Sequence, residues 1–262
     1  MDLDLKNKTA LVCGSTQGIG YAVANELAQL GANVVLLARD ESKLKQVQTE
    51  LYNGGDQKHY YLQGDFNEPD QLKKKVENFI SDVSPIHVLI NNTGGPPGGP
   101  IISAKPEEFL NAFNLHLISF HGLVQATLES MKSASYGRII NIISTSVKQP
   151  LNGLGVSNTI RGAVANWSKT LANELGPFNI TVNNVLPGAT NTSRLNSIIE
   201  NKAKKINSSS DQVLDNMKNE VPLLRIAEPN EVANAVAFLA SPAASYINGI
   251  NLPVDGGRTK SL

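Results

Sequence analysis

Short, continuous apolar segments alternate along this chain with longer segments in which apolar residues recur at helical spacing. Strands that are buried on both faces read as continuous apolar runs, and strands connected through helices lie parallel in one sheet. The sequence therefore predicts an α/β fold, a doubly wound parallel sheet of seven strands. The seven apolar segments are residues 9–14, 33–38, 59–63, 86–91, 137–143, 180–187 and 250–254.

The intervening segments have the 3.6-residue period of helices that face a core on one side. No linker rich in proline, glycine or serine interrupts the alternation, so we expect one domain over residues 1–262. The predicted helices are residues 18–31, 41–52, a helix that opens near Pro69, and residues 106–131, 156–175 and 229–240. A polar helical insertion is predicted at about 193–218, with helical periodicity at Leu195, Ile198 and Ile199 and again at Val213, Leu214 and Met217.

The amino-acid composition indicates which kinds of binding partner to expect and in which cellular compartment the protein works. Lys plus Arg and Asp plus Glu number 23 each, so charge gives no reason to expect a nucleic acid or an anionic membrane as partner. The single cysteine, Cys13, cannot form an internal disulfide and suits a reducing cytosol. The polar start MDLDLKNK does not resemble a signal peptide, and no apolar run approaches the ~20 residues that span a bilayer. A cytoplasmic protein is expected.

Three glycines, Gly14, Gly18 and Gly20, stand between the first predicted strand and the first helix. Glycine permits a tight turn and a close approach of the backbone to a phosphate, and a helix N-terminus supplies free N–H groups and a positive dipole end. This placement predicts a site for the pyrophosphate of a dinucleotide.

The spacing G-x-x-x-G-x-G resembles the short-chain dehydrogenase/reductase family, and the resemblance extends over almost the whole chain. Matching motifs are Asp65 after the third strand, NNTG at 91–94, Ser144 after the fifth strand, PG at 187–188 and INLPVDGG at 250–257. The resemblance implies a Rossmann-like fold and hydride transfer between a nicotinamide nucleotide and a carbonyl or alcohol. The cofactor-binding positions that it implies, besides the three glycines, are Ser15, Ile19, Asp65, Phe66, Asn92, Thr93, Gly94, Pro187, Gly188, Thr190 and Thr192.

The end of the second strand bears on which nucleotide is used. An acidic residue there would accept from the ribose 2′-hydroxyl of NAD, but the strand ends in Ala38 and Arg39 follows. A guanidinium suits the 2′-phosphate, so NADP(H) is favoured over NAD(H). Gln17 stands where many NADP-using relatives carry a second basic residue, so the preference for NADP is expected to be modest.

The catalytic positions depart from the family pattern. Aligned on residues 137–139, Ser144 matches the serine that polarises the substrate oxygen. The tyrosine position holds Ser157 and the lysine position one helical turn later holds Arg161. The asparagine position falls on His116, whereas Asn114 would fit only after a slip of two residues. This SNxxR pattern is similar to a divergent group resembling 3-oxoacyl-acyl-carrier-protein reductases.

These replacements leave the proton donor open. An aliphatic hydroxyl at Ser157 is far less acidic than a phenol, and Arg161 can bind ribose hydroxyls but does not shuttle protons. His116, with an ordinary pKa of ~6.5, is the first candidate for acid–base work, and Lys148 or a bound water is the alternative. We expect an NADP(H)-dependent oxidoreductase of 3-oxoacyl-like carbonyls or of alcohols. The alternatives are a catalytically impaired, nucleotide-binding protein or a different reaction such as epimerisation or dehydration.

The substrate side of the chain is expected to be formed by two segments. The resemblance implies a helical lid at about 191–221, and the glycine-rich loop 93–100 would be the opposite wall. Lys202, Lys204 and Lys205 are either a solvated face of that lid or a docking patch for an acidic carrier protein. The resemblance also implies a homotetramer or homodimer, paired through the last strand and the helix at 156–175.

Overall fold

The structure of this chain is a computed structural model that describes residues 1–261. Seven parallel strands form one sheet in the order β3-β2-β1-β4-β5-β6-β7, as the sequence predicts. The order reverses between β1 and β4, and this reversal leaves a crevice at the carboxyl ends of the strands. The strands are β1 (Thr9–Cys13), β2 (Asn33–Ala38), β3 (Tyr60–Gln63), β4 (Val88–Asn91), β5 (Gly137–Ile142), β6 (Ile180–Pro187) and β7 (Asn251–Val254).

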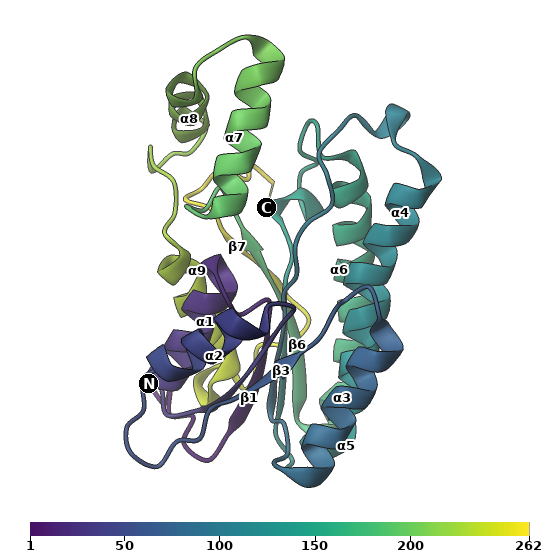
Figure 1. Ribbon diagram of the computed structural model, residues 1–262, viewed down its shortest axis with the longest axis vertical. Coiled ribbons are helices and arrows are strands. Elements are labelled where there is room, and N and C mark those ends of the chain that lie inside the picture. Colours follow the sequence, from purple (N-terminus) through teal and green to yellow (C-terminus); the bar gives the residue numbers. More distant parts are fainter. Residues whose placement is uncertain (262) are drawn as a thin grey trace.

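Helices cover both faces of the sheet, and each face has its own apolar core (Figure 1). On one face lie α1 (Gly18–Gln29), α2 (Glu41–Glu50) and α9 (Pro229–Ala240). On the other face lie α3 (Pro69–Asp82), α5 (Ser119–Ser133) and α6 (Gly155–Leu175), with α4 (Pro106–Phe113) packed on α6. Short 3-10 turns occur at Ile101–Ser103, Thr145–Val147, Gly176–Phe178 and Pro242–Ala244.

Two helices stand apart from these layers, beyond the carboxyl ends of the strands (Figure 1). They are α7 (Ser193–Ile206) and α8 (Ser210–Asn219), which lie in the segment where the sequence predicted a helical insertion at about 193–218. Asn207 adopts the left-handed conformation with φ of 54° and ends α7. Ser209 then caps α8 by accepting a hydrogen bond from the Gln212 N–H.

The helix predicted at 106–131 is also divided, by one π-helical turn at Asn114–Ile118. The extra residue in such a turn changes which side chains face inward. Asn114 is exposed and His116 is fully buried.

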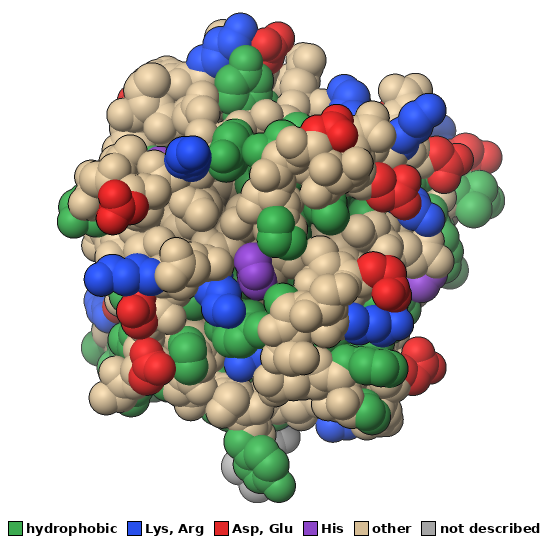
Figure 2. Space-filling model, turned by 90° about the horizontal axis from the view of Figure 1, so that it is seen from below, with side chains coloured by type: hydrophobic (Ala, Val, Ile, Leu, Met, Phe, Trp, Pro, Cys, Tyr) green, Lys and Arg blue, Asp and Glu red, His purple; other side chains and the backbone are tan. Residues whose placement is uncertain are grey.

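Charges are dispersed over the end of the molecule opposite to α7 and α8. Figure 2 shows Lys and Arg side chains on this face interspersed with Asp and Glu and with uncharged groups. Within residues 1–261, no helix is both long and apolar enough to cross a membrane. The same part of the chain has no group of three or more His, Cys, Asp or Glu side chains arranged to hold a metal ion.

A row of asparagine side chains crosses four neighbouring strands. Asn91 Nδ2 donates to Asn141 Oδ1 at 2.8 Å, and Asn141 Nδ2 donates to Asn184 Oδ1 at 3.0 Å. Asn184 Nδ2 donates in turn to Asn251 Oδ1 at 2.8 Å, and Ser168 of α6 also bonds to Asn184. These residues pair directly in the strand register, so the row fixes the lateral positions of β4 to β7. Ser144, one of the predicted catalytic residues, follows the carboxyl end of β5.

We predict that Asn141→Ala lowers the free energy of unfolding by about 2–4 kcal/mol, because it leaves the buried Asn91 amide without an acceptor and opens a small cavity. Urea denaturation measures the change. Asn166→Ala removes an exposed asparagine from α6 and is the control, with an expected effect within about 0.5 kcal/mol. Equal stability of the two variants would show that the row contributes little.

Candidate active site

The turn after β1 can be formed only by glycine at two of its positions. Gly14 and Gly18 adopt φ of 59° and 56°, a left-handed conformation that favours glycine. Gly20 has an ordinary φ, but a Cβ added there would lie 2.1 Å from the Gly14 carbonyl oxygen. The first turn of α1 therefore lies directly against the end of β1.

The groups around this turn leave donors free for a ligand. Gln17 precedes α1 without capping it through its side chain, so no side chain occupies the first N–H groups of the helix. Ser15 is fully buried, and its Oγ has no hydrogen-bond partner. Asn92 Nδ2 donates to the Cys13 carbonyl at 3.2 Å and thereby ties β4 to the turn. Free N–H groups, an unpartnered hydroxyl and a positive helix end fit a pyrophosphate.

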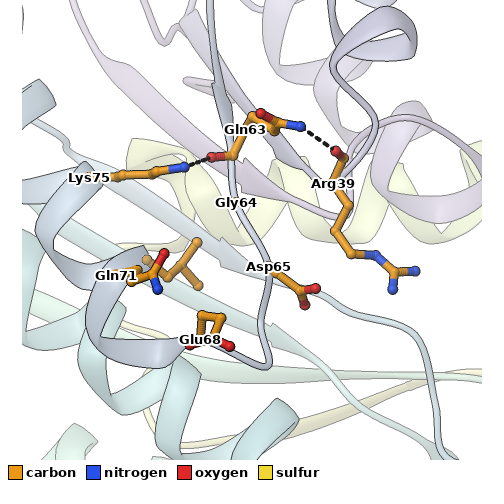
Figure 3. A pocket seen from close by; sticks show the side chains of 8 residues that line it. Arg39, Gln63, Gly64, Asp65, Glu68, Gln71 and Lys75 are labelled. Atoms are coloured by element: carbon orange, nitrogen blue, oxygen red, sulfur yellow. Dashed lines mark hydrogen bonds between the residues drawn. The ribbon is translucent and has the colours of Figure 1, made fainter.

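A hollow of about 260 Å³ lies at the carboxyl ends of β2 and β3, against the start of α3 (Figure 3). Gln63 Nε2 donates to the Arg39 carbonyl at 3.0 Å and Lys75 Nζ donates to the Gln63 carbonyl at 2.7 Å, which hold the two strand ends together. The Arg39 side chain extends from the end of β2 with its guanidinium turned away from the Asp65 carboxylate, and within residues 1–261 it forms no ion pair (Figure 3). A phosphate beside Arg39 would therefore meet an uncompensated guanidinium.

Asp65 and Phe66, two of the implied cofactor positions, have structural contacts of their own. Asp65 Oδ1 accepts from the Asn67 backbone N–H at 2.9 Å, and this bond shapes the loop after β3. The Phe66 ring is buried and packs edge-on against Phe120, with centroids 6.3 Å apart. Only the backbone of Phe66 remains to face a nucleotide.

Ser144 lies just beyond β5 and caps the 3-10 turn Thr145–Val147. Its Oγ accepts from the Ser146 backbone N–H at 3.1 Å, so its own hydroxyl proton is free to be donated. A hydroxyl held in this way can polarise a carbonyl oxygen. Ser157 lies half-buried in the first turn of α6.

Arg161 lies one helical turn after Ser157 on the same side of α6 and points inward. Only 7% of it is exposed, and its Nη1 donates to the Ile142 carbonyl at 3.1 Å. This hydrogen bond connects α6 to the end of β5, two residues before Ser144. Burial and the charge of Arg194 lower the pKa of Arg161 to about 10.

His116 is close to Arg161 but does not titrate near neutrality, contrary to the sequence-based expectation. Its ring is fully buried, lies edge-on to Phe120 at 5.9 Å, and has no hydrogen-bond partner at either nitrogen. Burial, followed by the positive charge of Arg161, lowers the pKa of His116 to about 2. The Gly94 backbone carbonyl, although not placed for a regular hydrogen bond, opposes this pKa shift in part. His116 is therefore neutral at physiological pH.

The first turn of α7 extends over the crevice. A Cβ added at Gly18 would lie 3.1 Å from Thr192 Cγ2, so the start of α7 lies directly above the glycine turn. Arg194 Nη2 donates to the Pro96 carbonyl at 2.7 Å and connects α7 to the glycine-rich loop. The sequence reasoning missed Arg194. The sequence signal that could have identified Arg194 is its position in the first turn of a helix, where the positive end of the helix dipole disfavours a cation.

The remaining predicted positions surround the crevice or flank it. Thr190 is buried and its Oγ1 donates to the Gly188 carbonyl at 3.1 Å, which rigidifies the loop after β6. Lys148 is half-buried, and its side chain makes no hydrogen bond within residues 1–261. The other positions lie on α1, on the loop after β4 and at the end of β6; they are Ile19, Thr93, Gly94 and Pro187.

We predict that His116 makes the protein less stable in acid. Above pH ~6.5 the histidine is neutral in both states, and as the pH falls the unfolded chain gains a proton that the folded protein does not accept until about pH 2. The loss between pH 7 and pH 5 attributable to this group is about 2 kcal/mol.

Urea denaturation at the two pH values should therefore show a larger loss for the natural chain than for His116→Leu. Groups common to both proteins, such as the buried His87, cancel in this difference. Identical losses would show that His116 titrates alike in both states.

Comparison with known proteins places this architecture among reductases. The family described as Enoyl-(Acyl carrier protein) reductase matches residues 14–259. The 3-oxoacyl-[acyl-carrier-protein] reductase FabG of Chlamydia trachomatis is 34% identical over 258 residues, covering 97% of this chain and 98% of that protein. The NADPH-dependent reductase BacG of Bacillus subtilis is 30% identical over 259 residues, covering 98% of this chain and all of that protein. The L-sorbose reductase of Gluconobacter frateurii, solved with NADPH and L-sorbose, is 30% identical and superposes with a TM-score of 0.93 over the full length of both chains.

Proposed function

This chain belongs to the short-chain dehydrogenase/reductase family, and from that premise we propose that it is an NADP(H)-dependent oxidoreductase that interconverts a carbonyl group and an alcohol. Relatives and solved structures named for NADPH support this cofactor. The bound nucleotide would supply or accept the hydride. The glycine turn, Ser15 and Arg39 would hold it.

The observation that carries the proposal is the position of Ser144 relative to the nucleotide cradle. Both lie at the carboxyl edge of the sheet, and the Ser144 hydroxyl proton is free to bond to a carbonyl oxygen. Arg161, fixed to the Ile142 carbonyl, adds a positive charge beside the same strand end. A fixed donor and a fixed charge in a water-poor site stabilise the oxyanion character that develops during hydride transfer.

Proton delivery must differ from that of relatives with a tyrosine. Ser157 has no acidic proton, and His116 is neutral at physiological pH. We therefore assign the proton to a water molecule that enters with the substrate beside Ser144 and Ser157. His116, buried against Phe120, would instead keep further water out of its part of the site.

The same departures support a second candidate, a protein that binds the nucleotide without turnover. The observation that favours it is the buried His116, whose ring nitrogens have no hydrogen-bond partner, together with our prediction that Ser157 and Arg161 stand at the positions of the phenol and the ammonium. We also propose that α7 and α8 form a lid over the substrate at 191–221. We further propose that the protein is a homotetramer or homodimer and that it is located in the cytoplasm.

We predict that the protein binds NADPH at least about tenfold more tightly than NADH, because a charge-assisted bond from Arg39 to the 2′-phosphate contributes about 1.5–3 kcal/mol. Arg39→Ala should bring the two dissociation constants close together, as measured by calorimetry. Lys74→Ala removes an exposed cation from α3 that does not line the hollow, and it should leave the ratio unchanged. Persistent discrimination in Arg39→Ala would assign the preference to another group.

We further predict that the protein oxidises NADPH in the presence of a carbonyl substrate and that Ser144→Ala lowers kcat/KM at least about tenfold while NADPH binding stays unchanged. Absorbance at the NADPH band across a panel of aldehydes, ketones and oxo acids measures the turnover. Tight NADPH binding with no oxidation by any carbonyl of the panel would favour the binding-only protein.

A further inference from the structure

Two guanidinium groups converge on one point of the glycine-rich loop. A Cβ added at Gly95 would lie 3.6 Å from Arg194 Nη2 and 3.9 Å from Arg161 Nη2. Arg161 comes from α6 and Arg194 comes from α7, so two separate helices direct their positive charges to the same place.

No acidic side chain neutralises this pair. In the part of the chain that the structure describes, neither arginine has a carboxylate within 4.0 Å. Their recorded hydrogen bonds are single bonds to backbone carbonyls, of Ile142 for Arg161 and of Pro96 for Arg194. A buried cation next to a like charge is unfavourable unless an anion compensates it. The arrangement is therefore typical of a binding site for an anionic group.

The position of the pair indicates which anion would bind. The pyrophosphate has its own donors, the first turn of α1 and Ser15, at the end of β1. Arg161 instead is held to Ile142, two residues before Ser144 on the same chain segment. The anion would thus lie beside the carbonyl that Ser144 binds. A guanidinium can bind a carboxylate through two parallel hydrogen bonds.

We propose that Arg161 and Arg194 bind a carboxylate of the substrate, so that this enzyme reduces short oxo acids. The inference rests on the proposed function and adds the substrate class to it. One hydride and one proton add across the C=O bond to give a hydroxy acid, NADPH is oxidised to NADP⁺, and the carboxylate is unchanged. A 3-oxoacyl thioester has no carboxylate at its carbonyl end and would leave the two guanidinium groups unpaired.

The test measures binding without turnover, in protein saturated with NADP⁺, which cannot reduce a ketone. Calorimetry compares 2-oxobutanoate, 3-oxobutanoate and 4-oxopentanoate with the methyl ester of each acid. We expect at least one acid to bind about tenfold or more tightly than its ester, because the ester has the same shape around the ketone but no charge. Equal binding of every acid and its ester would overturn the proposal.

Variants then assign the effect to the arginine pair. Arg194→Gln should weaken binding of the preferred acid at least about tenfold and that of its ester less than twofold, whereas Arg194→Lys should retain part of the affinity. Arg161→Lys keeps the buried charge, and it should also weaken binding of the acid more than binding of its ester. Lys202→Gln removes a cation two turns further along α7, and it should leave the dissociation constants of the acid and of its ester unchanged.

Two outcomes separate the possible causes of failure. If Arg194→Gln weakens NADP⁺ binding tenfold and leaves the acid unaffected, the pair binds a phosphate of the nucleotide and the proposal is overturned. If the acids bind selectively but are not reduced with NADPH, the carboxylate site stands and the proposed oxidoreductase activity fails.

Discussion

The site depends on the close approach of α1 to the end of β1. A Cβ at Gly20 would collide with the Gly14 carbonyl oxygen. Because glycine has no Cβ, the first turn of α1 can lie directly against the end of β1. The free N–H groups of that turn then point into the crevice that the strand order leaves open between β1 and β4. Asn92 joins β4 to the same turn, so the position of the phosphate site is fixed by backbone and amide contacts rather than by flexible side chains.

Around Ser144, the protonation state of His116 is set by its burial and by the charge of Arg161. Arg161 is buried, and its hydrogen bond to the Ile142 carbonyl fixes its position. Its charge adds to the effect of burial in keeping His116 neutral. A neutral histidine cannot deliver a proton as an imidazolium does. The paired guanidinium groups instead suit substrate binding and charge stabilisation.

Much of the fold could be predicted because continuous apolar strands leave a clear pattern in the sequence. The order of motifs led us to predict that Ser144, Ser157 and Arg161 are catalytic, and this remains a prediction. Features that depend on one residue were missed: the left-handed Asn207 that separates α7 from α8 and the π turn around His116. The asparagine row across β4 to β7 depends on lateral register, which single-sequence periodicity does not contain. Arg194 was missed because its role depends on where α7 crosses the loop after β4.

The most direct test of the account is a crystal structure of the protein with NADP⁺ bound. The account predicts the pyrophosphate against the first turn of α1, the 2′-phosphate beside Arg39, and the nicotinamide ring facing Ser144. A nucleotide bound elsewhere, or a nicotinamide directed away from Ser144 and Arg161, would contradict it.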